Sequence, residues 1–204
     1  MLVIAPDGAC QRTSDKLGLL SCSDPPQTVN APLIRLATLD DVPVLCALGA
    51  ATFRQTYRAI SDPREVDEYA DEHFTPVRVA AWFREPCART LLAVAGGAPA
   101  GYAHLRRARV PACVADREAI ELSRLYLLGS AQGSGLGSTM MATALAQAAE
   151  LEARSVWLGA YDRNVRALAF YARHGFVQVG THEFEFGGRT YADPVLTRPV
   201  VFTP

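Results

Sequence analysis

The sequence predicts an α/β protein in which helices pack on one central mixed sheet of a single domain. Segments with the apolar spacing of strands alternate with segments of helical spacing, in the order β-α-α, β-β-β, α, β, α, β-β. The chain has 204 residues, enough for one well-buried domain and few for two. Half of the residues are apolar and a fifth are charged, which is ordinary for a globular protein.

The first half of the domain shows strand and helix patterns in six segments. These are a strand at 33–37, a helix from Thr38 or Asp40 to about Thr56, one or two helices over 62–84, and strands at 90–97, 99–108 and 119–128. Pro76 interrupts the second helical segment because its ring cannot continue a helix interior. Gly96-Gly97 is expected to join the first two of the three consecutive strands as an antiparallel hairpin.

The second half shows five further segments. These are a helix at 136–151, a buried strand at 155–161, a helix at 164–174, and strands at 176–186 and 189–196. Gly175 suits the position just after the second helix, where a left-handed residue commonly ends it. Gly187-Gly188 is expected to join the last two strands as a hairpin.

Residues 1–31 have no clear periodicity and are rich in Ser, Asp, Pro and Gln. We interpret them as an extension outside the core, at least partly disordered, which leaves 32–204 as the domain. The opening five residues, MLVIA, are too short for a signal sequence and lack a basic region. No run approaches the roughly 18 apolar residues of a membrane span, so we expect a cytoplasmic protein without membrane contact.

The charge balance and the cysteines exclude other classes. A formal net charge of −1 argues against a nucleic-acid partner, which favours a basic excess. The five cysteines are odd in number, widely spread and without a Cys-x-x-Cys pair. They therefore predict neither a disulfide framework nor a zinc site, and we expect no metal.

The stretch QGSGLG, Gln132 to Gly137, places three glycines at alternate positions before the Ala-rich helix. Such a turn presents free backbone N–H groups and the positive end of a helix dipole, which together bind phosphates. A nucleotide P-loop needs a lysine after its last glycine, and Ser138 stands there instead. A dinucleotide fold needs more chain than follows Gly137. A phosphate site of another kind and a plain helix-entry turn remain open.

The next helix adds a more specific pattern. Asn164 and Tyr171 are seven residues apart, close to two helical turns, and so share one face. Taken alone, Asn164 fits a helix N-cap and Tyr171 a half-buried packing residue. Together with the glycine loop, this segment resembles the Gcn5-related N-acetyltransferase (GNAT) superfamily over roughly residues 33–196. The matching positions are Gln132, Gly135 and Gly137 of the acyl-CoA loop, and Asn164, Ala167, Tyr171, Gly175 and Phe176 of the following helix.

The resemblance implies an acetyl-CoA-dependent N-acetyltransferase with a sheet of about six or seven strands and a splayed central pair. The loop and the helix N-terminus would hold the pyrophosphate of coenzyme A through the backbone of Gly133, Ser134, Gly135, Leu136, Gly137 and Ser138. The splayed strand, with a bulge, would carry Leu125, Tyr126 and Leu127 and bind the pantetheine arm like an added strand. Asn164 would hydrogen-bond to that arm.

The resemblance also implies the catalytic groups. Tyr171 fits the family's general acid beside the sulfur of coenzyme A. Glu121, which precedes the splayed strand, fits the carboxylate that accepts the amine proton; a surface strand acid is the alternative. His104 is a second candidate base, with a hydrogen-bonded structural histidine as the plainer interpretation.

Residues 52–76 look like the corresponding region of the bacterial spermidine/spermine acetyltransferase-like subgroup, which covers the acceptor side of the cleft. This favours a polyamine as the small primary-amine acceptor, attracted by Glu65, Asp67, Glu68, Asp71 and Glu72. The same carboxylates also fit the solvated face of an amphipathic helix. Phe53 and Tyr57 either line the acceptor pocket or belong to the core. A protein or peptide acceptor and a non-catalytic acyl-CoA sensor are the alternatives, as a monomer or a homodimer.

Overall fold

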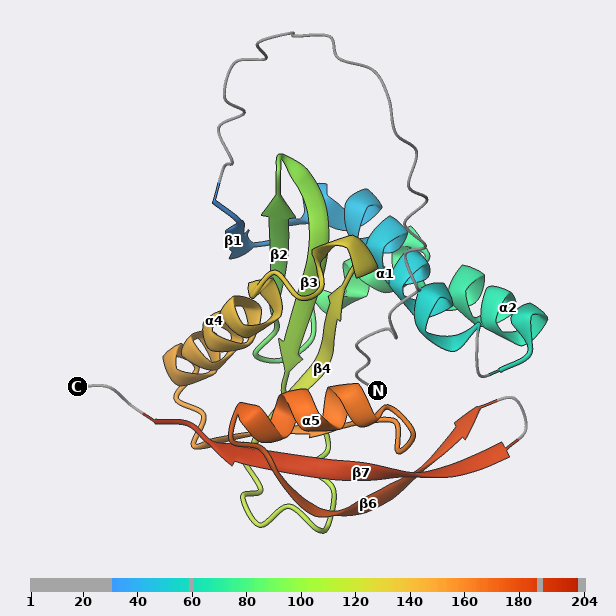
Figure 1. The fold of residues 1–204 in the computed structure, drawn as a ribbon. Coiled ribbons are helices and arrows are strands. Elements are labelled where there is room, and N and C mark those ends of the chain that lie inside the picture. The colour runs from blue at the N-terminus through green and yellow to red at the C-terminus, as the bar shows by residue number, and fades with distance from the viewer. Residues whose placement is uncertain (1–30, 59–60, 187–188, 202–204) are drawn as a thin grey trace, which may run out of the picture.

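A computed structural model describes residues 31–58, 61–186 and 189–201. They form one seven-stranded mixed sheet with the strand order β1-β2-β3-β4-β5-β7-β6 and helices on both faces, as predicted (Figure 1). The strands are β1 (Leu33–Leu36), β2 (Arg89–Ala95), β3 (Ala98–Arg106), β4 (Ile120–Leu127), β5 (Ser155–Gly159), β6 (Val177–Phe186) and β7 (Arg189–Pro199). The α-helices are α1 (Val42–Tyr57), α2 (Pro63–His73), α3 (Pro76–Trp82), α4 (Leu136–Glu150) and α5 (Val165–Arg173). Short 3-10 turns cover Leu39–Asp41 and Gly129–Ala131.

The sheet separates two apolar cores because side chains alternate between its faces. Leu91 and Leu125 lie in the core beneath α4 and α5. Leu92, Tyr102 and Tyr126 lie in the other core, beneath α1, α2 and α3. In Figure 1, α4 and the α1–α2 pair flank the strands β2 to β4. Strands β3 and β4 therefore have helices packed on both faces, α1 on one and α4 on the other.

The central strands β4 and β5 separate after a short contact. They pair in parallel only at Ile120 with Val156 and Glu121 with Trp157. Beyond Glu121, β4 continues to Leu127 while bonded on its other edge to β3. The backbone edge of β4 that faces β5 is thus left open, which is the splayed central pair that the family resemblance implies.

The start of the first helix differs from the prediction. Thr38 caps a 3-10 turn, and α1 begins only at Val42 with Asp41, not Asp40, at its N-cap. The Asp41 carboxylate caps nothing in α1 because it turns back to accept two hydrogen bonds from Arg35, at 2.6 and 2.7 Å. It also accepts the backbone N–H of Thr38 at 2.8 Å. This bidentate pair connects β1 to the start of α1.

The other element boundaries follow the sequence closely. Thr75 caps α3, so the break predicted at Pro76 is the start of a separate helix. Gly96 and Gly97 have φ of +57° and +79° and form the turn between β2 and β3. Strand β7 extends past the predicted end, to Pro199, where it pairs with Ser155 of β5. The predicted extension, apart from residue 31, and the predicted Gly187-Gly188 turn lie outside the described residues.

Candidate active site

The glycine loop leads from the end of β4 into α4, as the sequence predicts. Gly133 and Gly135 have φ of +78° and +85°, in the left-handed region that side chains disfavour. No atom lies within 4 Å of the position that a Cβ would take at either residue, so backbone conformation and not crowding requires glycine there. Gly137 differs: a Cβ there would lie 3.3 Å from Leu127 and 3.5 Å from Phe170. Its missing side chain lets the start of α4 approach β4 and α5.

The loop leaves backbone donors available. Within the described residues, no acceptor takes the N–H of Gly135 or Gly137, at the start of α4. Ser134 turns away from the open space, because its hydroxyl donates to the Ala131 carbonyl at 2.7 Å. Free N–H groups at a helix N-terminus and an open concavity are what an anionic ligand needs.

A cavity of about 180 Å³ lies against this loop. Of the predicted residues, Leu127, Gln132, Gly133, Gly135, Gly137 and Ser138 line it. Leu136 is instead buried in the core, where only its backbone faces the loop. The cavity is completed by Arg166, Phe170 and Arg173 of α5, which the sequence analysis did not name. Their spacing of four and three residues on one helical face was the available signal.

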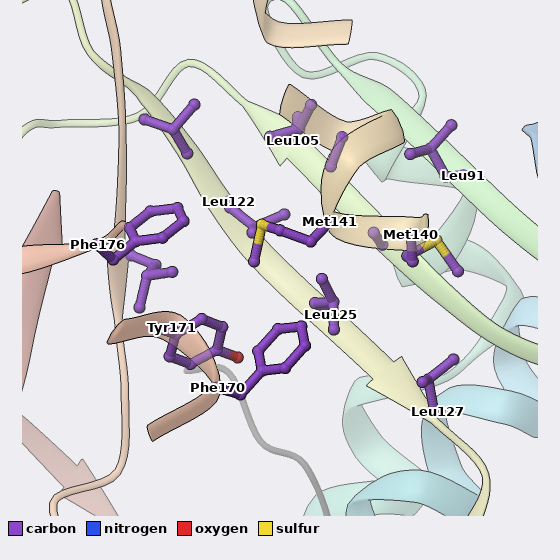
Figure 2. Close-up of a cluster of buried hydrophobic side chains, with 14 of the residues drawn as sticks. Leu91, Leu105, Leu122, Leu125, Leu127, Met140, Met141, Phe170, Tyr171 and Phe176 are labelled. Carbon is purple, nitrogen blue, oxygen red and sulfur yellow. The ribbon is translucent and has the colours of Figure 1, made fainter. Parts of the chain in front are cut away.

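Tyr171 lies on the buried side of α5 and does not line the 180 Å³ cavity at the glycine loop. Its side chain is 0% exposed, and it packs in the same core as Leu122 and Leu125 of β4. Figure 2 shows it extending from α5 toward β4. Its hydroxyl has no hydrogen-bond partner among the described residues. Burial raises the pKa of this phenol well above 10, so the hydroxyl keeps its proton at neutral pH.

Asn164 and Ala167 form the start of α5. The Asn164 side chain accepts the backbone N–H of Ala167 at 3.0 Å and caps the helix. The side-chain oxygen of Asn164 therefore acts as the helix N-cap that the sequence predicts. Ala167 is fully buried against the core.

Strand β4 carries a bulge in its pairing with β3. The register with β3 shifts between His104 opposite Arg124 and Leu105 opposite Leu122, which leaves Ser123 as the extra residue. The Ser123 hydroxyl donates to the His104 carbonyl at 3.2 Å. After the bulge, Leu125 and Leu127 face the α4 core while Tyr126 faces the α1 core.

Glu121 lies where the two strands part, and it is 8% exposed. Its Oε2 accepts a hydrogen bond of 2.6 Å from Arg106 Nε, and the same guanidinium lies 3.4 Å from Glu85 Oε2. No described group donates to Glu121 Oε1. Two carboxylates thus share one cation, and one oxygen of Glu121 stays available to a ligand.

His104 is fully buried and occupied on both ring nitrogens. Nδ1 lies 2.9 Å from the Thr90 hydroxyl, and Nε2 lies 3.2 Å from Glu85. Burial lowers its pKa, against the opposing effect of Glu85. The geometry agrees with a hydrogen-bonded structural histidine that supports the Glu85–Arg106 pair.

A second cavity, of about 80 Å³, lies on the α1 side of β4. It contains Phe53 and Glu121 of the predicted acceptor residues but not Tyr57, which packs in the core near Tyr161. Its other walls are Tyr69, His73, Phe74, Arg106, Ser123, Arg124 and Tyr126. Sequence reasoning did not assign these residues to the acceptor side, because they come from α2, the residue after it and two strands that only folding brings together.

The acidic face of α2 is largely neutralised by arginines of the same chain. Asp67 pairs with Arg54 and Arg58, at 2.8 and 2.7 Å, and Asp71 pairs with Arg54. Glu72 pairs with Arg78 at 2.6 Å. Only Glu65 and Glu68 of the five predicted polycation-binding carboxylates have no such partner in the described part of the chain.

Known proteins resemble this chain in sequence and in fold. The family described as the acetyltransferase (GNAT) family matches residues 53–176, from α1 to the end of α5. The chain belongs to the GNAT acetyltransferase family. An uncharacterized N-acetyltransferase of Mycobacterium bovis is 34% identical over 163 residues, which covers 80% of this chain and 100% of the relative. An uncharacterized N-acetyltransferase of Lactobacillus delbrueckii subsp. lactis is 25% identical over 161 residues, covering 79% of this chain and 93% of the relative.

Solved structures share the GNAT fold. The PaiA N-acetyltransferase of Thermoplasma acidophilum, in complex with coenzyme A, has a TM-score of 0.64 at 17% identity, covering 83% of this chain and 99% of that one. A putative phosphinothricin N-acetyltransferase has a TM-score of 0.62 at 22% identity, covering 84% and 100%. As a GNAT acetyltransferase, the chain is an acyltransferase. Among its described residues, no helix combines the length and apolar character that crossing a bilayer requires.

Proposed function

We propose that this GNAT acetyltransferase transfers the acetyl group of acetyl-CoA to a primary amine of a small molecule. The observation that carries the proposal is the buried, unpartnered hydroxyl of Tyr171, in the core that α5 shares with β4 and α4. A buried polar group without a partner costs stability, so its presence there indicates a partner that arrives with a ligand.

The glycine loop, the open edge of β4 and the start of α5 fit coenzyme A. The N–H groups of Gly135 and Gly137 would hold the pyrophosphate, with Arg166 and Arg173 beside them in the same cavity. The open edge of β4 at Leu125, Tyr126 and Leu127 would hydrogen-bond to the pantetheine amides as a further strand would. Asn164, at the N-terminus of α5, would contact the same arm.

Acetyl-CoA supplies a thioester whose carbonyl carbon receives the amine and whose sulfur leaves as a thiolate. Tyr171, still protonated because of its raised pKa, would donate its proton to that sulfur. Glu121 would accept the proton of the amine at Oε1, directly or through one water. At neutral pH only about one alkyl amine in a thousand is already uncharged, so this proton acceptor matters.

The acceptor would enter through the 80 Å³ cavity that contains Phe53 and Glu121. A polyamine is the acceptor that the acidic stretch predicts, but Asp67, Asp71 and Glu72 already pair with arginines. The remaining attraction for a polycation is correspondingly reduced. A protein or peptide amine would use the same coenzyme A residues.

A thiol-release assay with acetyl-CoA tests the proposal directly. The acceptors would be spermidine, spermine, aminoglycosides, single amino acids and short peptides, each with the wild type and with Tyr171→Phe. We expect turnover with one small-molecule class, lost in the variant. Tight coenzyme A binding without turnover of any acceptor would contradict an enzyme and favour a sensor. Turnover of peptides alone would contradict a small-molecule acceptor and favour a protein or peptide amine.

A further inference from the structure

Arg124 is a cation in the acceptor cavity that no carboxylate of the described chain neutralises. It follows the bulge at Ser123, and that extra residue reverses the alternation of β4. Without the bulge, a residue three positions after Glu121 would face the opposite side of the sheet. With it, Glu121 and Arg124 line the same cavity.

The guanidinium of Arg124 is held in place by an aromatic ring. Its Cζ lies 4.3 Å from the centroid of Trp82, a cation–π contact that fixes the group without neutralising its charge. Burial raises the pKa of Tyr69, a wall of the cavity, and the positive charges of Arg124 and, to a smaller extent, Arg78 oppose that rise. The residue is half-buried, so water screens it only in part.

The carboxylate that lines the cavity is Glu121. Its partner Arg106 is shared with Glu85, which lies outside the cavity lining, so these three groups together carry a net charge of −1. Arg124 and Glu121 form no ion pair with each other. One cavity therefore presents an acidic group and, separately, a basic group, between the aromatic walls Phe53 and Phe74.

We propose that the acceptor is a zwitterion, a small amino acid with an apolar or aromatic side chain, whose carboxylate pairs with Arg124 while its amine faces Glu121. The inference rests on the proposed function, because it places the acceptor in the same active site. An ammonium near Glu121 and a carboxylate at Arg124 match the two charges, and the ring walls match the side chain. Arg124 is thus the specificity-determining residue.

Matched acceptor pairs test this inference. Phenylalanine and phenethylamine, and methionine and 3-(methylthio)propylamine, differ only by the carboxylate. For the wild type, we expect kcat/KM to be at least about tenfold higher for the amino acid of each pair. In Arg124→Gln, we expect about a 10–100-fold loss with the amino acid, mainly through KM, and little change with the amine. Arg124→Lys should restore part of the loss.

Arg78→Gln is the matched control, because Arg78 is an exposed arginine that pairs with Glu72 outside the cavity. Thermal melting of each variant shows whether the fold is kept. Turnover of amines or polyamines with no preference for a carboxylate would overturn the inference and leave the proposed function intact. An equal loss for both members of a pair in Arg124→Gln would also overturn it. No thiol release with any acceptor would overturn both.

Discussion

Replacing Tyr171 with phenylalanine should make the protein more stable and far less active. The substitution removes one oxygen that is fully buried and has no partner among the described residues. A buried polar group without a hydrogen bond costs about 1–3 kcal/mol, while the ring and its packing remain unchanged. We therefore expect the free energy of unfolding of the ligand-free protein to rise by about 1–2 kcal/mol. For a chain of this size, Tm would rise by about 2–8 °C.

The same substitution removes the proposed proton donor. General acid catalysis typically contributes about 10²–10⁴ in rate, so kcat should fall by that factor while the affinity for coenzyme A changes little. Because burial raises the pKa of Tyr171 well above 10, the wild-type rate should show no alkaline loss due to this group below about pH 10.

Thermal melting without ligand and thiol release with the best acceptor measure the two effects. Tyr102→Phe is the matched control: Tyr102 is also fully buried but packs on Trp82 in the opposite core, so its loss should leave kcat unchanged. A kcat for Tyr171→Phe within about twofold of the wild type would refute the acid role. A clear fall in Tm would show that the hydroxyl has a stabilising partner in the free protein.

Three further substitutions have defined outcomes. Glu121→Gln should lower kcat by a factor of about 10²–10⁴ in the thiol-release assay. Glu118→Gln, at an exposed ion pair, should leave kcat unchanged. An equal loss of kcat in both variants would contradict the role of Glu121 as the proton acceptor. Gly135→Ala forces a side chain to φ +85°, so Tm should fall and KM for acetyl-CoA should rise. Gly97→Ala, at φ +79° in the β2–β3 turn and outside the loop cavity, should lower Tm alone. An equal rise in KM for Gly97→Ala would be inconsistent with the role of the loop. Asp41→Asn should lower the free energy of unfolding by about 1–2 kcal/mol at neutral pH, because hydrogen bonds from Arg35 lower the Asp41 pKa to about 2. That contribution is present above about pH 4 and is lost as the pH falls toward 2. The free energy of unfolding should therefore depend less on pH in this range for the variant than for the wild type. An equal pH dependence for the two proteins would refute the role of Asp41.

The parts of the site that are local in sequence could be predicted. The glycine loop depends on backbone conformation at Gly133 and Gly135, which only glycine adopts at low cost. Asn164 caps the helix that carries Tyr171, and both positions follow from the local helix pattern. For the same reason, nearly all helices and strands have the predicted order and bounds, because their apolar periodicity is local.

The acceptor side could not be predicted, because it depends on pairing between distant segments. Arg106 meets Glu121 only through the register of β3 with β4. The bulge at Ser123 reverses which side chains face the cavity. The family resemblance implied a bulge in this strand, but not the side chains that it turns toward the acceptor side. The acidic stretch of α2 was predicted to attract a polycation, but the tertiary contact with α1 brings Arg54 against Asp67. The polyamine acceptor therefore stays a prediction that the ion pairs weaken.

The structure of this chain with coenzyme A bound tests the central claim most directly. The account predicts the pyrophosphate on the backbone N–H groups of Gly135 and Gly137, the pantetheine along the open edge of β4, and the sulfur within hydrogen-bond reach of the Tyr171 hydroxyl. Coenzyme A bound away from the splayed strands, or a sulfur out of reach of Tyr171, would contradict it.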